Sequence, residues 1–207
     1  MMKKLIAGML ASCLIFGSYA VMADDSTAES AESTATGTVE LNWEDFEAIN
    51  AAADQDLISQ GEFKTFDEIA VKMWVPNVLQ EVELTDEDRE QGFIAYYQTA
   101  DEDAAASVVY ADVQGMDLET YKAELEKSED VKEIEDLVVN GIPCVSYDMP
   151  EADTTCVSFA TEAGYILEFS FKPMSDEGFQ SVIAYMGASI QPEETEEAAA
   201  SEAESVA

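Results

Sequence analysis

Apolar residues recur along the chain in two patterns, which predict a fold that mixes helices with strands. Spacings of three and four residues predict helices with one apolar face at 43–53, at 117–128 and at 175–187. The first of these faces consists of Trp43, Phe46, Ile49 and Ala53. The residues expected to cap these helices at their N-termini are Asn42, Asp117 and Ser175.

Runs of β-branched and aromatic residues predict strands between these helices. The runs lie at 63–75, 93–99, 107–113, 134–140, 142–149, 154–161 and 165–171, and a short strand is expected at 188–191. In the run at 165–171, one face carries Tyr165, Leu167, Phe169 and Phe171, and the other, wetter face carries Ile166, Glu168, Ser170 and Lys172. One buried and one wetter face is typical of antiparallel strands. The sequence therefore predicts an α+β fold, an antiparallel β-sheet with helices packed on one face.

Residues 1–23 have the three parts of a secretory signal peptide. Lys3 and Lys4 precede an apolar run, and Ala23 ends the segment with a small side chain. We expect cleavage after Ala23 and an extracytoplasmic protein, either secreted or held in the cell envelope. Two alternatives stay open, lipidation at Cys13 and an uncleaved membrane anchor. Cleavage is preferred over lipidation because lipidation would leave the apolar residues 14–16 at the start of the mature chain.

Two segments beside the predicted domain lack the residues that a core needs. Residues 24–40 and 192–207 consist mainly of Ser, Thr, Ala and acidic residues. Such a composition does not offset the conformational entropy lost on ordering. We therefore expect a disordered acidic linker at 24–40, a single α+β domain at 41–191 and a disordered acidic tail at 192–207.

The charge of the chain narrows the range of partners. The sequence has 45 acidic and nine basic residues, a net charge of −36, and two of the nine are Lys3 and Lys4. So few cations cannot neutralise phosphates, which excludes nucleic acid, and an anionic membrane surface would repel the protein. An unknown protein or a cationic ligand remains possible. The charge is also explained by solubility alone, and we expect a monomer.

Two cysteines follow the signal peptide, Cys144 and Cys156. They lie symmetrically about Pro150, so a hairpin centred there would place them opposite each other. Exported proteins commonly form disulfides, and the spacing and the compartment together predict a Cys144–Cys156 bridge. The alternative is two small apolar side chains that never meet.

Most catalytic chemistry lacks its residues in this chain. There is no histidine, and Arg89 is the single arginine. We therefore expect no catalytic residue and no cofactor. A carboxylate-dependent hydrolase stays as an alternative, because acidic residues are abundant. The acidic triplets at 86–88 and 101–103 do not match a calcium loop, so no metal site is expected, and their predicted roles are to cap a helix and to keep a hairpin tip hydrated.

Three short segments resemble the Mog1/PsbP-like sandwich family. They are a strand that ends in proline (residues 72–76, KMWVP), a strand start (141–144, GIPC) and the end of the last helix (188–190, ASI). The resemblance covers residues 62–191, and the helix at Trp43 is an addition to it. It implies a non-enzymatic binding or assembly role and transfers no site residue. The chain is also similar to exported proteins of gut anaerobic bacteria.

The sequence thus leads to one principal hypothesis, an exported, non-enzymatic binding or assembly module. The first alternative is an envelope or secreted protein that binds cations such as calcium or polyamines. The second is the carboxylate-dependent hydrolase.

Overall fold

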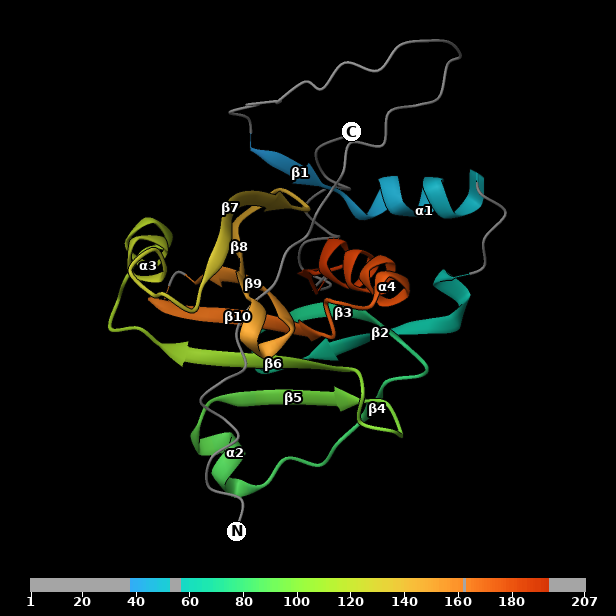
Figure 1. Ribbon diagram of the computed structural model, residues 1–207, viewed down its shortest axis with the longest axis horizontal. Helices are drawn as coiled ribbons and strands as arrows, with labels where there is room; N and C mark the ends of the chain where they lie inside the picture. The colour runs from blue at the N-terminus through green and yellow to red at the C-terminus, as the bar shows by residue number, and fades with distance from the viewer. Residues whose placement is uncertain (1–37, 53–56, 162, 194–207) are drawn as a thin grey trace, which may run out of the picture.

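Two β-sheets face each other across a shared core in the computed structural model, which describes residues 38–52, 57–161 and 163–193 (Figure 1). The larger sheet has eight strands in the order β1-β7-β8-β9-β10-β6-β5-β4, and the smaller has three in the order β11-β3-β2. The predicted α+β class is confirmed, and the second sheet is an addition to the single predicted one. The strands of the larger sheet are β1 (Val39–Leu41), β4 (Gln80–Glu81), β5 (Phe93–Gln98), β6 (Ala105–Asp112), β7 (Lys132–Val139), β8 (Ile142–Met149), β9 (Thr154–Ala160) and β10 (Tyr165–Lys172).

The ends of the fold extend slightly beyond the predicted domain. β1 pairs in parallel with β7, so Val39 and Glu40 belong to the sheet rather than to the linker. At the other end, β11 (Gln191–Pro192) pairs with β3, so Pro192 belongs to a strand rather than to the tail. The predicted cleavage point at Ala23 and the alternative lipidation point at Cys13 lie outside the described residues. No helix within the described ranges is long and apolar enough to cross a membrane.

The apolar run at 63–75 forms two strands rather than one. β2 (Gly61–Phe66) and β3 (Val71–Pro76) pair as an antiparallel hairpin, joined by residues 67–70. Asp67 and Glu68 interrupt the apolar run at this turn, and Ala70 closes it with a left-handed backbone (φ 50°). The prediction missed the turn because it contains neither Gly nor Pro, and Asp67 is its one residue of a type common in turns.

The helices form close to where the spacing of apolar residues predicts them. They are α1 (Trp43–Ala52), α3 (Leu118–Leu125) and α4 (Glu177–Ala188), and a further short helix, α2 (Asp86–Glu90), begins at the acidic triplet that was expected to cap a helix. Asp117 caps α3 as predicted, since its carboxylate accepts a hydrogen bond from the Thr120 N–H at 2.8 Å. The predicted cap of α4 is one residue off. Asp176 caps that helix, whereas the Ser175 hydroxyl donates to the carboxylate of Asp153 at 2.9 Å.

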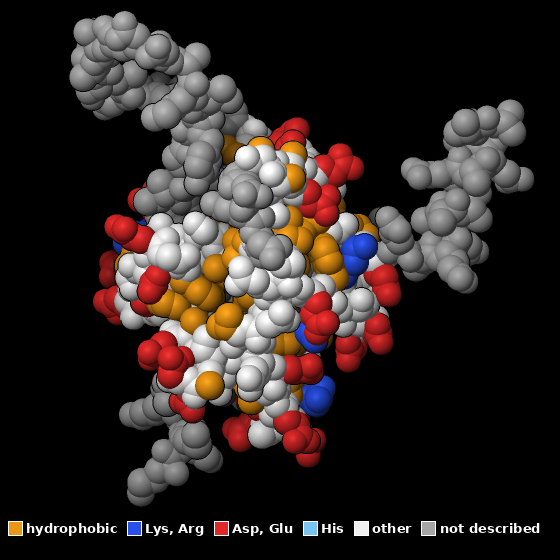
Figure 2. Space-filling view, turned by 90° about the vertical axis from the view of Figure 1, so that its right-hand side faces the viewer, with side chains coloured by type: hydrophobic (Ala, Val, Ile, Leu, Met, Phe, Trp, Pro, Cys, Tyr) orange, Lys and Arg blue, Asp and Glu red, His pale blue; other side chains and the backbone are white. Residues whose placement is uncertain are grey.

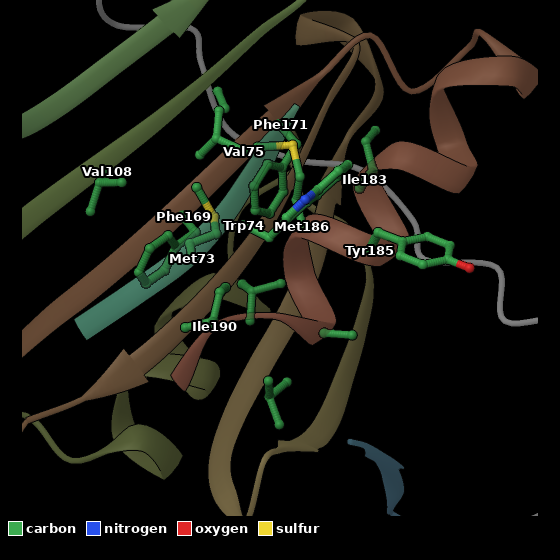
Figure 3. Packing of buried hydrophobic residues seen from close by; sticks show 14 of the residues in the cluster. Met73, Trp74, Val75, Val108, Phe169, Phe171, Ile183, Tyr185, Met186 and Ile190 are labelled. Atoms are coloured by element: carbon green, nitrogen blue, oxygen red, sulfur yellow. The ribbon is translucent and has the colours of Figure 1, made fainter. Parts of the chain in front are cut away.

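The core fills the space between the two sheets, and α4 lies within it. Figure 1 shows α4 in front of β3 and below α1, and α4 contacts β3, β10 and α1. In Figure 3, Met73 and Val75 from β3 meet Phe169 and Phe171 from β10 beside Met186 of α4. All five side chains are buried. Because strands and a helix from both halves of the chain supply it, this core joins the two sheets into one unit.

The second face of the larger sheet is also buried, contrary to the wetter face predicted for β10. Ile166, Glu168 and Ser170 on this face are 1%, 8% and 4% exposed. α3 covers this face, and Leu118, Tyr121 and Leu125 pack there against Val145 and Tyr147 of β8. The sequence did not place α3 on this side of the sheet.

The predicted disulfide between Cys144 and Cys156 is absent, and both residues are buried thiols. The register of β8 and β9 pairs Cys156 with Tyr147. Cys144 therefore lies on the inter-sheet face, and Cys156 lies on the α3 face. The turn spans residues 150–153, so the hairpin is centred after Glu151 rather than on Pro150. Because faces alternate at every residue, this change in centre places the two sulfurs on opposite sides of the sheet.

We expect both thiols to be protected in the folded protein and released together on unfolding. Burial raises the pKa of Cys144 to about 12, so its reactive thiolate is scarce at neutral pH. Treatment with a maleimide should label neither residue under native conditions and both in urea. Mass spectrometry reads this directly. A non-reduced protein two hydrogen atoms lighter, with no labelling in urea, would contradict the register.

One side chain, that of Asn140, ties together three parts of the fold. Asn140 and Gly141 form the two-residue turn between β7 and β8, both with positive φ (48° and 80°), as a type I′ turn requires. The side-chain oxygen of Asn140 accepts a hydrogen bond from the Trp43 N–H. Its side-chain nitrogen donates to the backbone carbonyls of Ala188 and Ile190, and all three bonds are 2.8 Å long. The turn thereby holds the start of α1 and the end of α4.

Replacing Asn140 should destabilise the fold through these three hydrogen bonds. Asn140→Gly keeps the backbone freedom and removes the side chain, and we expect it to lower the free energy of unfolding by about 1–3 kcal/mol. Asn140→Ala should cost more, because alanine is strained at positive φ. Urea denaturation of both variants separates the loss of the side-chain hydrogen bonds from the backbone strain. Equal stability of Asn140→Gly and the wild type would show that the side-chain bonds contribute nothing.

Candidate functional site

The space between the two sheets opens at one end into a hollow of about 390 Å³, which we call the inter-sheet hollow. The turn between β2 and β3 bounds it on one side, and the ends of β6, β8, β9 and β10 bound it on the other. Its lining residues are Asp67, Glu68, Ile69, Ala70, Val71, Tyr110, Ile142, Phe159, Thr161, Leu167, Ile190 and Gln191. Both sheets therefore contribute to one site.

Buried apolar side chains form the inner part of the hollow. Phe159, Leu167 and Ile190 line it and are 5%, 4% and 2% exposed, and all three belong to the main core. Phe159 and Leu167 face each other across the β9–β10 pair. The inner end of the hollow is therefore formed by the edge of the core, and regular strands hold these side chains in place.

An aromatic pair supports one wall. Tyr110 lines the hollow, and its ring stacks on Tyr165 with centroids 4.6 Å apart and planes 13° from parallel. Tyr165 is fixed in turn by Thr161, whose hydroxyl accepts from the Tyr165 N–H at 3.1 Å and donates to its carbonyl at 3.2 Å. The ring stacking and these two hydrogen bonds fix the position of this wall.

The mouth of the hollow carries acidic side chains. Asp67 and Glu68 are exposed on the turn between β2 and β3. The N–H of Glu193 donates to the carbonyl of Ala70 at 2.8 Å, which brings a third acidic residue to the same turn. Acidic side chains also outnumber basic ones on the face shown in Figure 2, in keeping with the net charge of −36. The hollow thus has an apolar interior and a negative rim.

A second polar feature lies on the α3 face of the larger sheet. There the Glu168 carboxylate accepts a hydrogen bond from the Tyr147 hydroxyl and another from Tyr121, the latter at 3.3 Å. Ser158 and Ser170 each add a longer contact of 3.4 Å. We call these five residues the Glu168 cluster. It joins α3 to three neighbouring strands.

Burial raises the pKa of three side chains in this cluster, Glu168, Tyr121 and Tyr147. It raises the pKa of Glu168 above its ordinary value, against the lowering effect of the hydrogen bonds from Tyr147 and Tyr121. Burial, followed by the nearby charge of Glu168, also raises the pKa of both tyrosines. The two hydroxyls therefore stay protonated and donate to the carboxyl group. The cluster serves as a hydrogen-bonded support for α3.

The buried carboxylates do not form a catalytic pair. Glu168 and Asp148 are the buried acidic residues within the described ranges. Asp148 follows the parity of Cys144 on β8 and faces the inter-sheet side, whereas Glu168 lies with Tyr147 on the opposite face. A glycosidase mechanism needs both carboxyl groups on one substrate, about 5–9 Å apart. This arrangement does not support the hydrolase alternative.

The two acidic triplets serve local structure. Asp88 completes a capping box at the start of α2, and hydrogen bonds from Thr85 lower its pKa. A hydrogen bond from Thr99 likewise lowers the pKa of Asp101 in the β5–β6 turn. Within the part of the chain that the structure describes, no three His, Cys, Asp or Glu side chains gather as metal ligands do.

The sequence alone revealed neither the inter-sheet hollow nor the Glu168 cluster. Cys144 and Cys156, the residues it paired, lie on opposite faces, and Cys156 donates to Ser170 at the edge of the Glu168 cluster (3.2 Å). The hollow combines residues from six elements far apart in the chain. The local signal for it was the Asp67–Glu68 interruption of an apolar run.

Comparisons with known proteins add a likeness in fold. No protein-family model and no curated protein matches the chain. Among solved structures, the chain is similar to the solution structure of cyanobacterial PsbP (CyanoP) from Synechocystis sp. PCC 6803, with a TM-score of 0.45 and 10% sequence identity. The match covers 65% of this chain and 94% of that chain. At this level of similarity we transfer no residue and no role.

Proposed function

We propose that this chain is an exported, non-enzymatic binding module that holds an apolar group of its ligand in the inter-sheet hollow. One observation carries the proposal, a volume of about 390 Å³ lined by apolar side chains of both sheets. Small-molecule sites in proteins usually have about 300–1,000 Å³ and a mostly apolar lining with few polar groups. Regular strands hold the lining in place, which favours binding without rearrangement.

The polar groups around the hollow support binding rather than catalysis. The Thr161 hydroxyl is bonded to the backbone of Tyr165, and Asp67 and Glu68 are exposed on a turn. The chain has no histidine to act as a base. Export is proposed from the signal-like sequence of residues 1–23.

Filling the hollow should weaken binding strongly. Ile142 lines the hollow at the start of β8 and is partly exposed. We expect Ile142→Phe to weaken the binding of small aromatic amines and alcohols at least tenfold, because the larger ring occupies their space. Titrations of ¹⁵N-labelled protein, purified after export, measure the affinity and locate the shifted amides.

Val78→Phe is the matched control, since it adds a ring at a position that is 58% exposed and outside the hollow. It should leave the affinity unchanged. Equal weakening by both variants, or amide shifts scattered away from Phe159 and Leu167, would contradict the proposed site.

A further inference from the structure

The rim of the inter-sheet hollow carries one sign of charge. Asp67 and Glu68 are the charged residues in its lining, and both are acidic. Glu193 is hydrogen-bonded through its backbone to the same turn. The two lysines that flank this turn in the sequence do not line the hollow: Lys64 pairs with Glu62, and Lys72 lies over the ring of Phe63 at 5.5 Å. A ligand entering the hollow therefore passes carboxylates without a compensating cation in the lining.

This rim disfavours anionic occupants, including the chain's own C-terminal segment. Residues 193–207 contain acidic residues and no basic one. The net charge of −36 extends the same field beyond the mouth. Such a field repels anions and raises the local concentration of cations. An apolar interior and a negative rim are together complementary to a molecule with an apolar body and a positive end.

We infer that the hollow binds a small organic cation, with the apolar body inside and an ammonium group beside Asp67 and Glu68. The inference rests on the proposed function of the hollow and adds the chemical class of its ligand. The volume of about 390 Å³ lies near the lower end for ligand pockets, which favours a single ring or a short chain. Aromatic rings attract ammonium groups, and Tyr110 places one in the lining.

Three probes that share a phenyl ring test the class of ligand. They are 2-phenylethylamine (a cation), 2-phenylethanol (neutral) and 3-phenylpropionate (an anion). Titrations at low salt should show the amine binding about five to ten times more tightly than the alcohol, and the anion binding least, since exposed charge pairs contribute modestly. The preference should shrink at high salt.

Two charge variants locate the effect. Asp67→Asn/Glu68→Gln should weaken binding of the amine about five- to tenfold and leave the alcohol unchanged. Glu102→Gln/Asp103→Asn removes the same charge from the β5–β6 turn, at the end of β6 opposite to Tyr110, and should change neither. Equal loss in both variants would overturn the inference, because the net charge rather than the rim would then be responsible.

The remaining outcomes separate the inference from the proposed function. Equal binding of all three probes, blocked by Ile142→Phe, would overturn the inference and leave the binding site standing. Binding of none of them would overturn both. Spermine tests charge without a ring, and the peptide Gly-Lys-Gly tests a lysine side chain of a protein partner. Tighter binding of either one at the hollow would overturn a small amphipathic cation as the ligand.

Discussion

Replacing Trp74 with alanine is expected to lower the free energy of unfolding by about 3–5 kcal/mol, as for other large buried side chains. Trp74 is 1% exposed and lies between β2 and α4. Its indole N–H donates to the carbonyl of Ile58 at 3.0 Å, and its ring lies 6.3 Å from that of Tyr185. Gly61 admits the ring, since a Cβ there would come within 2.4 Å of it. The substitution removes the indole ring from the contact between the smaller sheet and α4.

Urea denaturation followed by circular dichroism measures this loss. Trp74→Phe should cost less than Trp74→Ala, because it keeps part of the volume and loses the hydrogen bond. Val78→Ala, at a position 58% exposed, should change stability by less than about 0.5 kcal/mol. A loss below about 1 kcal/mol for Trp74→Ala would mean that the smaller sheet does not depend on this side chain.

Replacing Glu168 with glutamine is expected to stabilise the protein at neutral pH, by about 1–4 kcal/mol if the gain is like that seen when buried ion pairs are replaced by uncharged residues of similar volume. The amide retains the shape of the carboxyl group and an oxygen that accepts from Tyr147 and Tyr121. It also removes the desolvation that raises the pKa of Glu168. The gain should depend on pH.

The direction of that dependence follows from the raised pKa. The folded state holds the Glu168 proton more tightly than the unfolded state does. The stability contributed by this proton is complete below the ordinary value of 4.5 and is lost as the pH rises through the higher folded value. The advantage of Glu168→Gln should therefore grow with pH from about this point.

A pH series of urea denaturations on matched variants measures this trend. Glu47→Gln, at an exposed position of α1, is the control and should show no such growth. A constant difference between Glu168→Gln and the wild type from acidic to neutral pH would contradict a buried, protonation-sensitive carboxyl group. Lower stability of Glu168→Gln at pH 7 would contradict the expected cost of the charge.

Regular elements were predictable where their signal is local. The strand at 165–171 and the cap of α3 by Asp117 depend on neighbours in the sequence, and the structure confirms both, whereas the wetter face predicted for β10 is buried. The Asp67–Ala70 turn was missed because an apolar run on both sides reads as one strand when no Gly or Pro divides it.

Contacts between distant segments could not be derived in the same way. The β8–β9 register depends on the centre of a four-residue turn, and a change in that centre moved Cys144 and Cys156 to opposite faces. Glu168 has a polar side chain typical of a wet face, yet α3 covers it with Tyr121. The inter-sheet hollow arises only when the β2–β3 turn meets the end of the larger sheet.

The most direct test of the proposed ligand site is an intermolecular nuclear Overhauser experiment on the protein with bound 2-phenylethylamine. Binding in the inter-sheet hollow predicts contacts from the phenyl protons to Phe159 and Leu167, and from the methylene next to the ammonium group to residues of the 67–70 turn. Contacts to exposed apolar side chains elsewhere, such as Phe63 and Ile49, with none to Phe159 or Leu167, would contradict it.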